Sequence, residues 1–153
     1  MDDDRFETFV GEVRPRLARA FVAAYGLERG QEALAEAMAY AWEHFVDLDR
    51  MGNPAGYLYR VGRSRSRPRP GVRSGVAFPA PDDLGLPRVE PKLATALASL
   101  SERQRACVAL VHGYGWTHQE TADLLGLRRS SVQNHVERGL HRLRRAIGVY
   151  DDA

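Results

Sequence analysis

The stretch LGLRRSSVQNHV, residues Leu125–Val136, decides the fold of this chain. It follows THQETADLL, whose apolar residues are spaced as on one face of a helix. Gly126 can adopt the left-handed backbone that ends a helix. After a turn of about three or four residues a second helix starts at Ser130, and its apolar residues are Val132, Val136, Leu140, Leu143 and Ile147. The stretch therefore predicts two helices joined by a short turn, which is the helix-turn-helix arrangement.

The second helix of this pair has a polar, basic outer face. Gln, Asn, Ser and Arg at its N-terminal end are residue types that read base edges in the major groove, and its further arginines suit phosphate contacts. The alternative is a solvated surface helix whose arginines stabilise its C-terminal dipole. We predict DNA contacts by Arg128, Arg129, Ser130, Ser131, Gln133, Asn134, Glu137, Arg138, His141, Arg142 and Arg145.

Three capping boxes mark helix starts in this part of the chain. The pairs are Ser101 with Gln104, Thr117 with Glu120, and Ser130 with Gln133. The preceding segment PKLATALASL predicts a further short helix.

The first part of the chain is also helical in pattern. Residues 5–25 are amphipathic, and Pro15 should kink this helix or divide it in two. A second helix is expected at Gln31–Phe45 after the turn-like GLERG. NPAGYLYRVGR opens a third, with Asn53 as its cap and Pro54 at its first position.

Between these parts, RSRSRPRPGVRSGVAFPAPDDLGLPRVEP has no periodicity and is rich in Pro, Gly, Ser and Arg, which predicts a linker. We therefore expect an all-α protein with two small helical domains. The predicted boundaries are 1–67 for the first domain, 68–90 for a flexible linker and 91–153 for a helix-turn-helix domain of four helices.

Composition excludes several classes of protein. The chain is 44% hydrophobic and has no apolar run near the roughly 18 residues of a membrane span. Its acidic start, MDDDRFE, is unlike a signal peptide, so we expect a cytoplasmic protein without membrane partners. The single cysteine, Cys107, is expected in the core, and the histidines show no ligand spacing. We predict no metal site, no cofactor, no small-molecule substrate and no catalytic residue.

The segment LSERQRACVALVHGYGWTHQETADLLGLRRSSVQNHVERGLHRLRRAI resembles region 4 of bacterial RNA polymerase sigma factors, particularly the extracytoplasmic-function (ECF) group of the sigma-70 family. The resemblance rests on L-S-E-R-Q-R before an apolar helix, on T-x-x-E-x-A-x-x-L-G, and on S-V opening a helix that ends L-x-R-L-R-R. In that family region 4 reads the minus-35 promoter element. The resemblance therefore implies double-stranded promoter DNA as a partner.

The first part resembles region 2 of the same group in FETFVGEVRPRLARAF, EALAEAMAYAWEHF and NPAGYLYRVGRS. This implies docking on core RNA polymerase, and it adds an anti-sigma factor as a further candidate partner. Ala35 departs from the family's Gln-Glu pair, so only Glu36, with Glu32 one turn earlier, carries over as a polymerase contact. A solvated helix face is the alternative for both glutamates.

A second departure concerns promoter melting. The family's corresponding helix runs on through residues that recognise and help melt the promoter, whereas Pro68 and Pro70 should end this one by about Arg67. Tyr57 and Tyr59 are candidates for stacking on unpaired bases, with core packing expected for at least one. Trp42 and Trp116 are assigned to packing.

These observations favour a transcription initiation factor of the ECF sigma type and no enzyme. Two alternatives remain: a sigma-like helix-turn-helix regulator without promoter melting, and an adapter that binds polymerase or an anti-sigma factor.

Overall fold

The computed structural model describes residues 3–66 and 91–148, and every element in these two ranges is helical. The all-α class is therefore confirmed for the described residues. The predicted linker 68–90 lies outside them. We call residues 3–66 the front segment and residues 91–148 the rear segment.

The front segment begins with two long helices, α1 (Asp3–Tyr25) and α2 (Leu27–Glu43). Pro15 does not divide α1, contrary to one of the two expectations for it. It lies on the exposed side of the helix, where the carbonyl group that loses its amide partner can bond to water.

The predicted turn GLERG is shorter than expected, because α2 begins at Leu27 and only Gly26 separates it from α1. Gly26 has φ 84°, which turns the chain sharply between the helices. Gly30 is inside α2, at a point where the two helices cross closely. A Cβ atom at this position would lie 2.9 Å from the Val22 backbone, so only glycine fits. The glycine that suggested a loop is thus a packing residue.

Two shorter helices complete the front segment. After α3 (Phe45–Asp49), α4 (Pro54–Arg65) begins as predicted, with Pro54 at its first position and the Asn53 Oδ1 atom accepting a hydrogen bond from the Gly56 amide at 3.1 Å. The helix ends at Arg65, in agreement with the predicted stop by about Arg67.

The rear segment contains α5 (Pro91–Ala98), α6 (Glu102–Val108), the π-helical turn η1 (Ala109–Gly113), α7 (His118–Leu125) and α8 (Arg129–Ile147). The capping boxes at Ser101 and Thr117 are present. The one predicted at Ser130 is wrong, because α8 already begins at Arg129 and Arg128 is its uncapped N-cap residue. Ser130 is helical and lacks the extended backbone that a cap requires.

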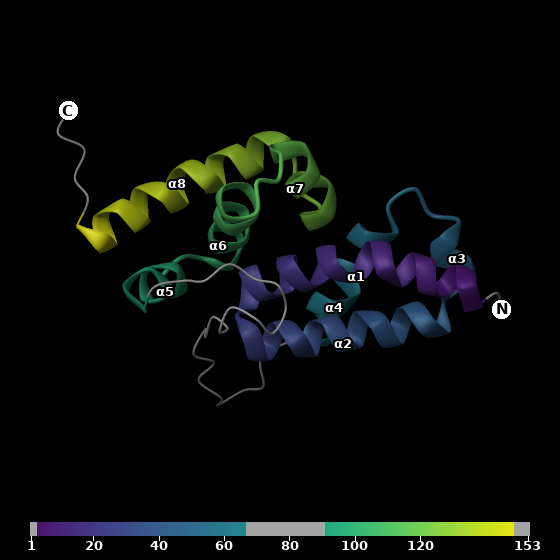
Figure 1. Cartoon of the computed structure of the whole chain (residues 1–153). Helices are drawn as coiled ribbons and strands as arrows, with labels where there is room; N and C mark the ends of the chain where they lie inside the picture. The colour runs from purple at the N-terminus through teal and green to yellow at the C-terminus, as the bar shows by residue number, and fades with distance from the viewer. Residues whose placement is uncertain (1–2, 67–90, 149–153) are drawn as a thin grey trace.

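The two segments share one hydrophobic core. Phe21, Leu17 and Leu58 of the front segment are fully buried in the same cluster as Leu110 and Leu124 of the rear segment. In Figure 1, α6 and α7 lie against the α1 and α4 side of the front bundle, while α5 and α8 extend away from it. The helix-turn-helix is therefore seated on the front helices in this arrangement.

Polar contacts accompany the shared core. The Asn53 Nδ2 atom donates to the Asp123 carbonyl at 2.9 Å, so this residue both caps α4 and holds α7. The buried Arg105 guanidinium donates to the carbonyl group of Ala24 at the end of α1. Arg16 lies 5.9 Å from the ring centre of Trp116. Trp116 is partly buried against the shared core, which agrees with its assignment to packing.

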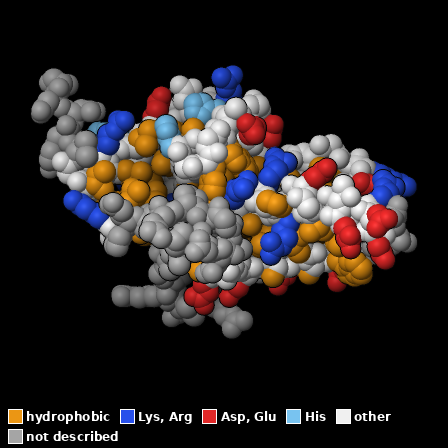
Figure 2. Space-filling model, in the orientation of Figure 1, with side chains coloured by type: hydrophobic (Ala, Val, Ile, Leu, Met, Phe, Trp, Pro, Cys, Tyr) orange, Lys and Arg blue, Asp and Glu red, His pale blue; other side chains and the backbone are white. Residues whose placement is uncertain are grey.

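The surface charge is uneven. Figure 2 shows acidic side chains gathered at the end of the molecule where α1 begins and α3 lies. None of the described helices is long and apolar enough to cross a membrane.

Candidate nucleic-acid and polymerase interfaces

The turn between α7 and α8 has the geometry that its sequence predicts. Gly126 has a left-handed backbone, with φ 70° and ψ 35°, and the Leu127 amide donates to the Ala122 carbonyl at 3.0 Å. Arg128 is extended, and α8 begins at the next residue. These contacts set the angle at which α8 leaves the turn.

The start of α7 is held by its capping box. The Glu120 amide donates to the Thr117 hydroxyl at 3.0 Å, and the Thr117 amide donates to the Glu120 carboxylate at 3.2 Å. The hydroxyl of the buried Thr121 donates back to the Thr117 carbonyl at 2.9 Å. The first helix of the motif is thus anchored at the end that faces away from the turn.

The inner face of α8 packs on the rear helices. Val132 and Val136 are buried with Cys107, and Leu143 is buried with Leu97. Burial raises the pKa of the Cys107 thiol to about 12, so the thiol stays protonated and acts as a small apolar side chain. The core expectation for Cys107 is confirmed.

The outer face of α8 leaves the predicted DNA-contact residues accessible. Ser131 is half-buried, and the others are exposed: Arg128, Arg129, Ser130, Gln133, Asn134, Glu137, Arg138, His141, Arg142 and Arg145. The side chains predicted to read bases, at the N-terminal end, and the arginines towards the C-terminal end therefore share one accessible side of the helix. DNA contact by these residues stays a prediction.

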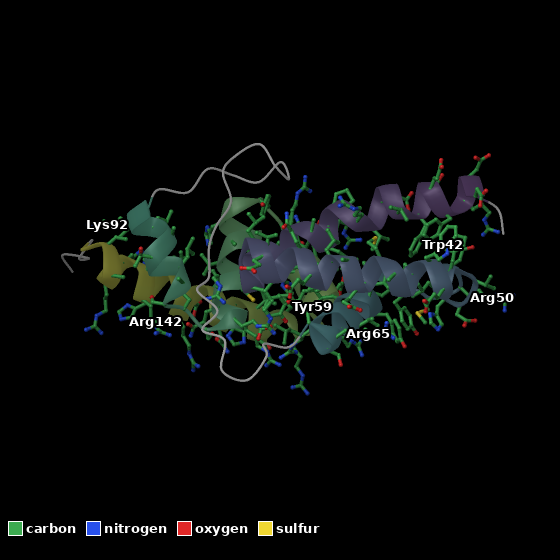
Figure 3. The ribbon with its side chains drawn as sticks, turned by 90° about the horizontal axis from the view of Figure 1, so that it is seen from below. Trp42, Arg50, Tyr59, Arg65, Lys92 and Arg142 are labelled. Carbon is green, nitrogen blue, oxygen red and sulfur yellow. The ribbon has the colours of Figure 1, made fainter. Side chains whose placement is uncertain are left out.

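Three of these side chains have protein partners. The Gln133 amide lies 3.4 Å from the Glu137 carboxylate, which orients both on the exposed face. Arg142 donates to the Gln104 side chain and to the Ser99 carbonyl, each at 3.1 Å. Arg142 therefore ties α8 to the junction of α5 and α6. Figure 3 shows it at the end of the molecule where Lys92 also lies.

The charge of α8 comes from its arginines. His135 is half-buried, and its pKa is lowered by burial and by the positive charges of Arg103 and Arg138. The imidazole is consequently neutral at pH 7.

The predicted polymerase contacts, Glu32 and Glu36, lie one turn apart on α2 and are both exposed. Hydrogen bonds and ion pairs to other described residues are absent from both side chains. Polymerase contact by these two glutamates also stays a prediction.

The two tyrosines of α4 have different environments. Tyr59 is only 4% exposed and stacks on Phe21 with ring centres 4.9 Å apart, so it is a core residue. Tyr57 is 37% exposed, and its hydroxyl lies 3.2 Å from that of Tyr40. This agrees with the expectation that at least one of the two tyrosines packs in the core.

The sequence interpretation missed an exposed aromatic cluster around Tyr40. The His44 ring stacks on Tyr40 with centres 3.9 Å apart, and the Arg65 guanidinium lies 5.2 Å from the same ring. The spacing of four residues between Tyr40 and His44 was a signal for their contact. The contacts of Tyr40 with Tyr57 and Arg65 join α2 to α4, and they could be identified only from the tertiary structure.

The packing assignment is wrong in part for Trp42, which is 53% exposed. Its ring meets Phe6 edge-on with centres 5.0 Å apart, but its outer side is open, because α2 ends nearby and no further helix covers it among the described residues. Figure 3 places Trp42 and Arg50 at the same end of the molecule.

Comparisons with known proteins agree with this geometry. Residues 91–143, which include α7 and most of α8, match the family model for sigma-70, region 4. A segment of 68 residues is 31% identical to the ECF RNA polymerase sigma factor SigK of Mycolicibacterium vanbaalenii. That match covers 44% of this chain and 35% of the relative, so it spans about a third of the relative's length.

The fold also has a solved counterpart. The sigma factor RpoE from Bartonella quintana, solved in complex with the anti-sigma factor NepR, superposes with a TM-score of 0.68 at 19% identity. The superposition covers 95% of this chain and 98% of that one. Residues 91–143 are therefore similar to sigma-70 region 4, and the chain as a whole has the fold of that solved sigma factor, in agreement with the resemblance seen in its sequence.

Proposed function

We propose that this chain is a transcription initiation factor of the ECF sigma type. It binds core RNA polymerase through the front segment and directs the enzyme to promoters through α8, which reads the minus-35 element. The observation that carries the proposal is the exposed face of α8, with Gln133 and Asn134 at its N-terminal end, in a region 4 domain.

The helix-turn-helix is suited to this task in the arrangement described here. Its inner face is fully used in packing, while the base-reading side chains stay accessible even though the rear segment is seated on the front one. Arg138 supplies an exposed positive charge one turn from Asn134, where phosphate contacts would position the helix.

Duplex binding tests the role of α8. A selection from random duplexes would supply the preferred site, after which Gln133→Ala and Asn134→Ala are each expected to cost about 1 to 3 kcal/mol on that site and little on unrelated DNA. Arg138→Ala should weaken both complexes about equally. Equal losses on both duplexes for Gln133→Ala would contradict base reading.

Polymerase binding tests the front segment. The double variant Glu32→Lys, Glu36→Lys should no longer coelute with bacterial core RNA polymerase in size exclusion. The matched control is Glu7→Lys, Glu12→Lys, which reverses two exposed charges on α1 and should leave coelution unchanged. Wild-type protein that fails to bind at micromolar concentration would contradict a sigma role.

One observation favours a second function, that of a sigma-like regulator without promoter melting. Helix α4, which carries Tyr57 and Tyr59, ends at Arg65, so only six helical residues follow Tyr59 to hold separated strands. Open-complex formation with core polymerase distinguishes the two functions. A chain that recruits polymerase to its site without strand separation would be such a regulator.

The adapter function makes a different prediction for salt. A protein that contacts several phosphates loses duplex affinity steeply between low and physiological salt, whereas an adapter shows no salt-sensitive duplex binding.

RpoE of Bartonella quintana was solved with an anti-sigma factor. We include such a factor among the proposed partners of this chain.

A further inference from the structure

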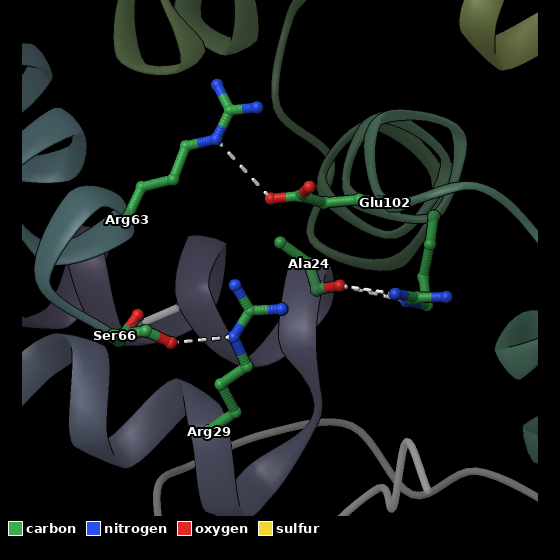
Figure 4. Close-up of polar contacts among 6 residues, drawn as sticks. Ala24, Arg29, Arg63, Ser66 and Glu102 are labelled. Carbon is green, nitrogen blue, oxygen red and sulfur yellow. Dashed lines mark hydrogen bonds and ion pairs between the residues drawn. The ribbon is translucent and has the colours of Figure 1, made fainter. Parts of the chain in front are cut away.

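A cavity at the junction of the two segments has a lining that the proposed function does not use. Its volume is about 500 Å³, and it is lined by Arg29 of α2, by Arg60, Arg63 and Ser64 of α4, and by Glu102 of α6. In Figure 4, Arg29 and Arg63 point from their helices towards the same space, and Glu102 reaches it from the rear segment. Among the described residues, three guanidinium groups therefore line this cavity together with one carboxylate.

Arg29 is held in position for binding. Its Nε atom donates to the Ser66 carbonyl at 2.9 Å, and its guanidinium lies 4.0 Å from the ring centre of Tyr25. The terminal nitrogens of this group make no hydrogen bond to the described residues and are free to donate. A guanidinium fixed in this way loses little side-chain freedom when an anion binds.

The described residues compensate little of the positive charge in the cavity. Glu102 lies 3.7 Å from the Arg63 Nε atom, and both side chains are partly exposed, so this ion pair is weak. Arg60 has no hydrogen bond or ion pair to the described residues. An anion of sufficient charge could therefore bind Arg60 and Arg29, and could compete with Glu102 for Arg63.

A residue beside Arg29 also has unused hydrogen-bonding capacity. The hydroxyl group of Ser66 is buried without a hydrogen-bond partner among the described residues. Buried hydroxyl groups in folded proteins are nearly always bonded to protein, water or ligand. Ser66 follows the lining residue Ser64 by two positions, and its backbone carbonyl accepts a hydrogen bond from Arg29.

We propose that this cavity binds a small anion that carries two or more phosphate groups. Arginine forks match the oxygen atoms of phosphate, and cavities of roughly 300–1,000 Å³ accept ligands of nucleotide size. Three arginines from two helices can bind more than one phosphate group, and because the arginines outnumber Glu102, the described lining attracts an anion more strongly as its charge increases. The site uses none of the residues proposed for duplex reading by α8 or for polymerase docking.

Calorimetric titration of the full chain with inorganic pyrophosphate, in chloride buffer of constant ionic strength, tests the proposal. Arg60→Gln should weaken binding at least about fivefold, since one charged hydrogen-bond donor is lost. Glu102→Gln should tighten it, because the competing carboxylate becomes neutral. Arg14→Gln, which removes an exposed arginine from α1, is the matched control and should change nothing.

A second measurement locates the bound anion. Pyrophosphate should shift the backbone amide resonances of Arg60, Arg63 and Ser64 and leave those of the α8 outer face unchanged. Thermal melting without ligand shows whether each variant is folded, so that lost binding is not mistaken for unfolding.

Several outcomes would overturn the proposal. One is the absence of pyrophosphate binding to wild-type protein at millimolar concentration. Another is equal weakening by Arg60→Gln and Arg14→Gln, which would indicate a general charge effect. A third is a loss of duplex affinity in Arg60→Gln with pyrophosphate binding unchanged, which would make Arg60 a contact for the DNA backbone.

Discussion

Arg105 is the residue whose removal should most directly test the contact between the two segments. Its side chain is buried, and its Nε and Nη2 atoms both donate to the Ala24 carbonyl of α1. Its Nη1 atom donates to the Leu100 carbonyl at 2.9 Å, with longer contacts of 3.4 Å to Leu97 and Ala98. One guanidinium thus satisfies carbonyl groups at the end of α1 and at the junction of α5 and α6.

We expect Arg105→Met to lower the free energy of unfolding by about 3 kcal/mol. A hydrogen bond to a charged group contributes about 1.5 to 3 kcal/mol, and two buried carbonyl sites lose a short bond of this kind. Part of the loss is offset because no cation then has to be desolvated, a cost that also lowers the pKa of Arg105. For a chain of this length the melting temperature should fall by roughly 6 to 12 °C.

Urea denaturation followed by far-ultraviolet circular dichroism measures this change. Arg103→Met is the matched control, because Arg103 is exposed on the same helix and should change stability by less than about 0.5 kcal/mol. Arg105→Lys should recover only part of the loss, since an ammonium group cannot span the same carbonyls. A loss below about 1 kcal/mol in Arg105→Met would refute the reasoning, as would separate unfolding of the two segments in the wild-type protein.

Three further predictions concern the rear segment. Gly139→Ala should destabilise the protein by about 1 to 3 kcal/mol in urea denaturation, because the new Cβ atom would lie 2.6 Å from the Val108 Cγ2 atom. Adding Val108→Ala to this variant should relieve the clash. A Gly139→Ala variant as stable as the wild-type protein would contradict this packing. Gly126→Ala should lower the free energy of unfolding by about 1 kcal/mol, because φ is 70° at this position. Gly113→Ala is the control and should lower it by less, since Gly113 has open space around it and an ordinary φ. Equal losses in the two variants would contradict the left-handed turn. Cys107 should react with a thiol reagent at pH 8 only after unfolding in urea, since burial raises its pKa to about 12; rapid labelling of the folded protein would show that the thiol is accessible.

Much of the helical architecture could be predicted from the sequence because it depends on neighbours a few residues apart. The capping boxes at Ser101 and Thr117, the Asn53 cap and the left-handed Gly126 each involve atoms within about one helical turn. The inner face of α8 followed from spacing alone, and the accessible side chains of the candidate DNA interface followed from it.

Local signals were misleading where a distant contact decided the outcome. Gly30 was interpreted as part of a loop, but it lies within α2. The residue is a glycine because α1 crosses there too closely for a side chain. Ser130 has the composition of a cap, yet the turn after Gly126 places the helix start one residue earlier. Trp42 was assigned to packing, but α2 ends close to it, and the side chain is half exposed.

By itself the sequence determined the helices, most of their boundaries, the helix-turn-helix and its outward face, because backbone hydrogen bonds and side-chain periodicity are local. Only the tertiary structure decided which helices share a core, that Arg105 is buried against a carbonyl 81 residues away, and that three arginines and Glu102 line one cavity. These features depend on burial and on charges brought together by packing. The spacing of residues along the chain does not predict such contacts, because they form only when helices distant in sequence exclude water from a common interface.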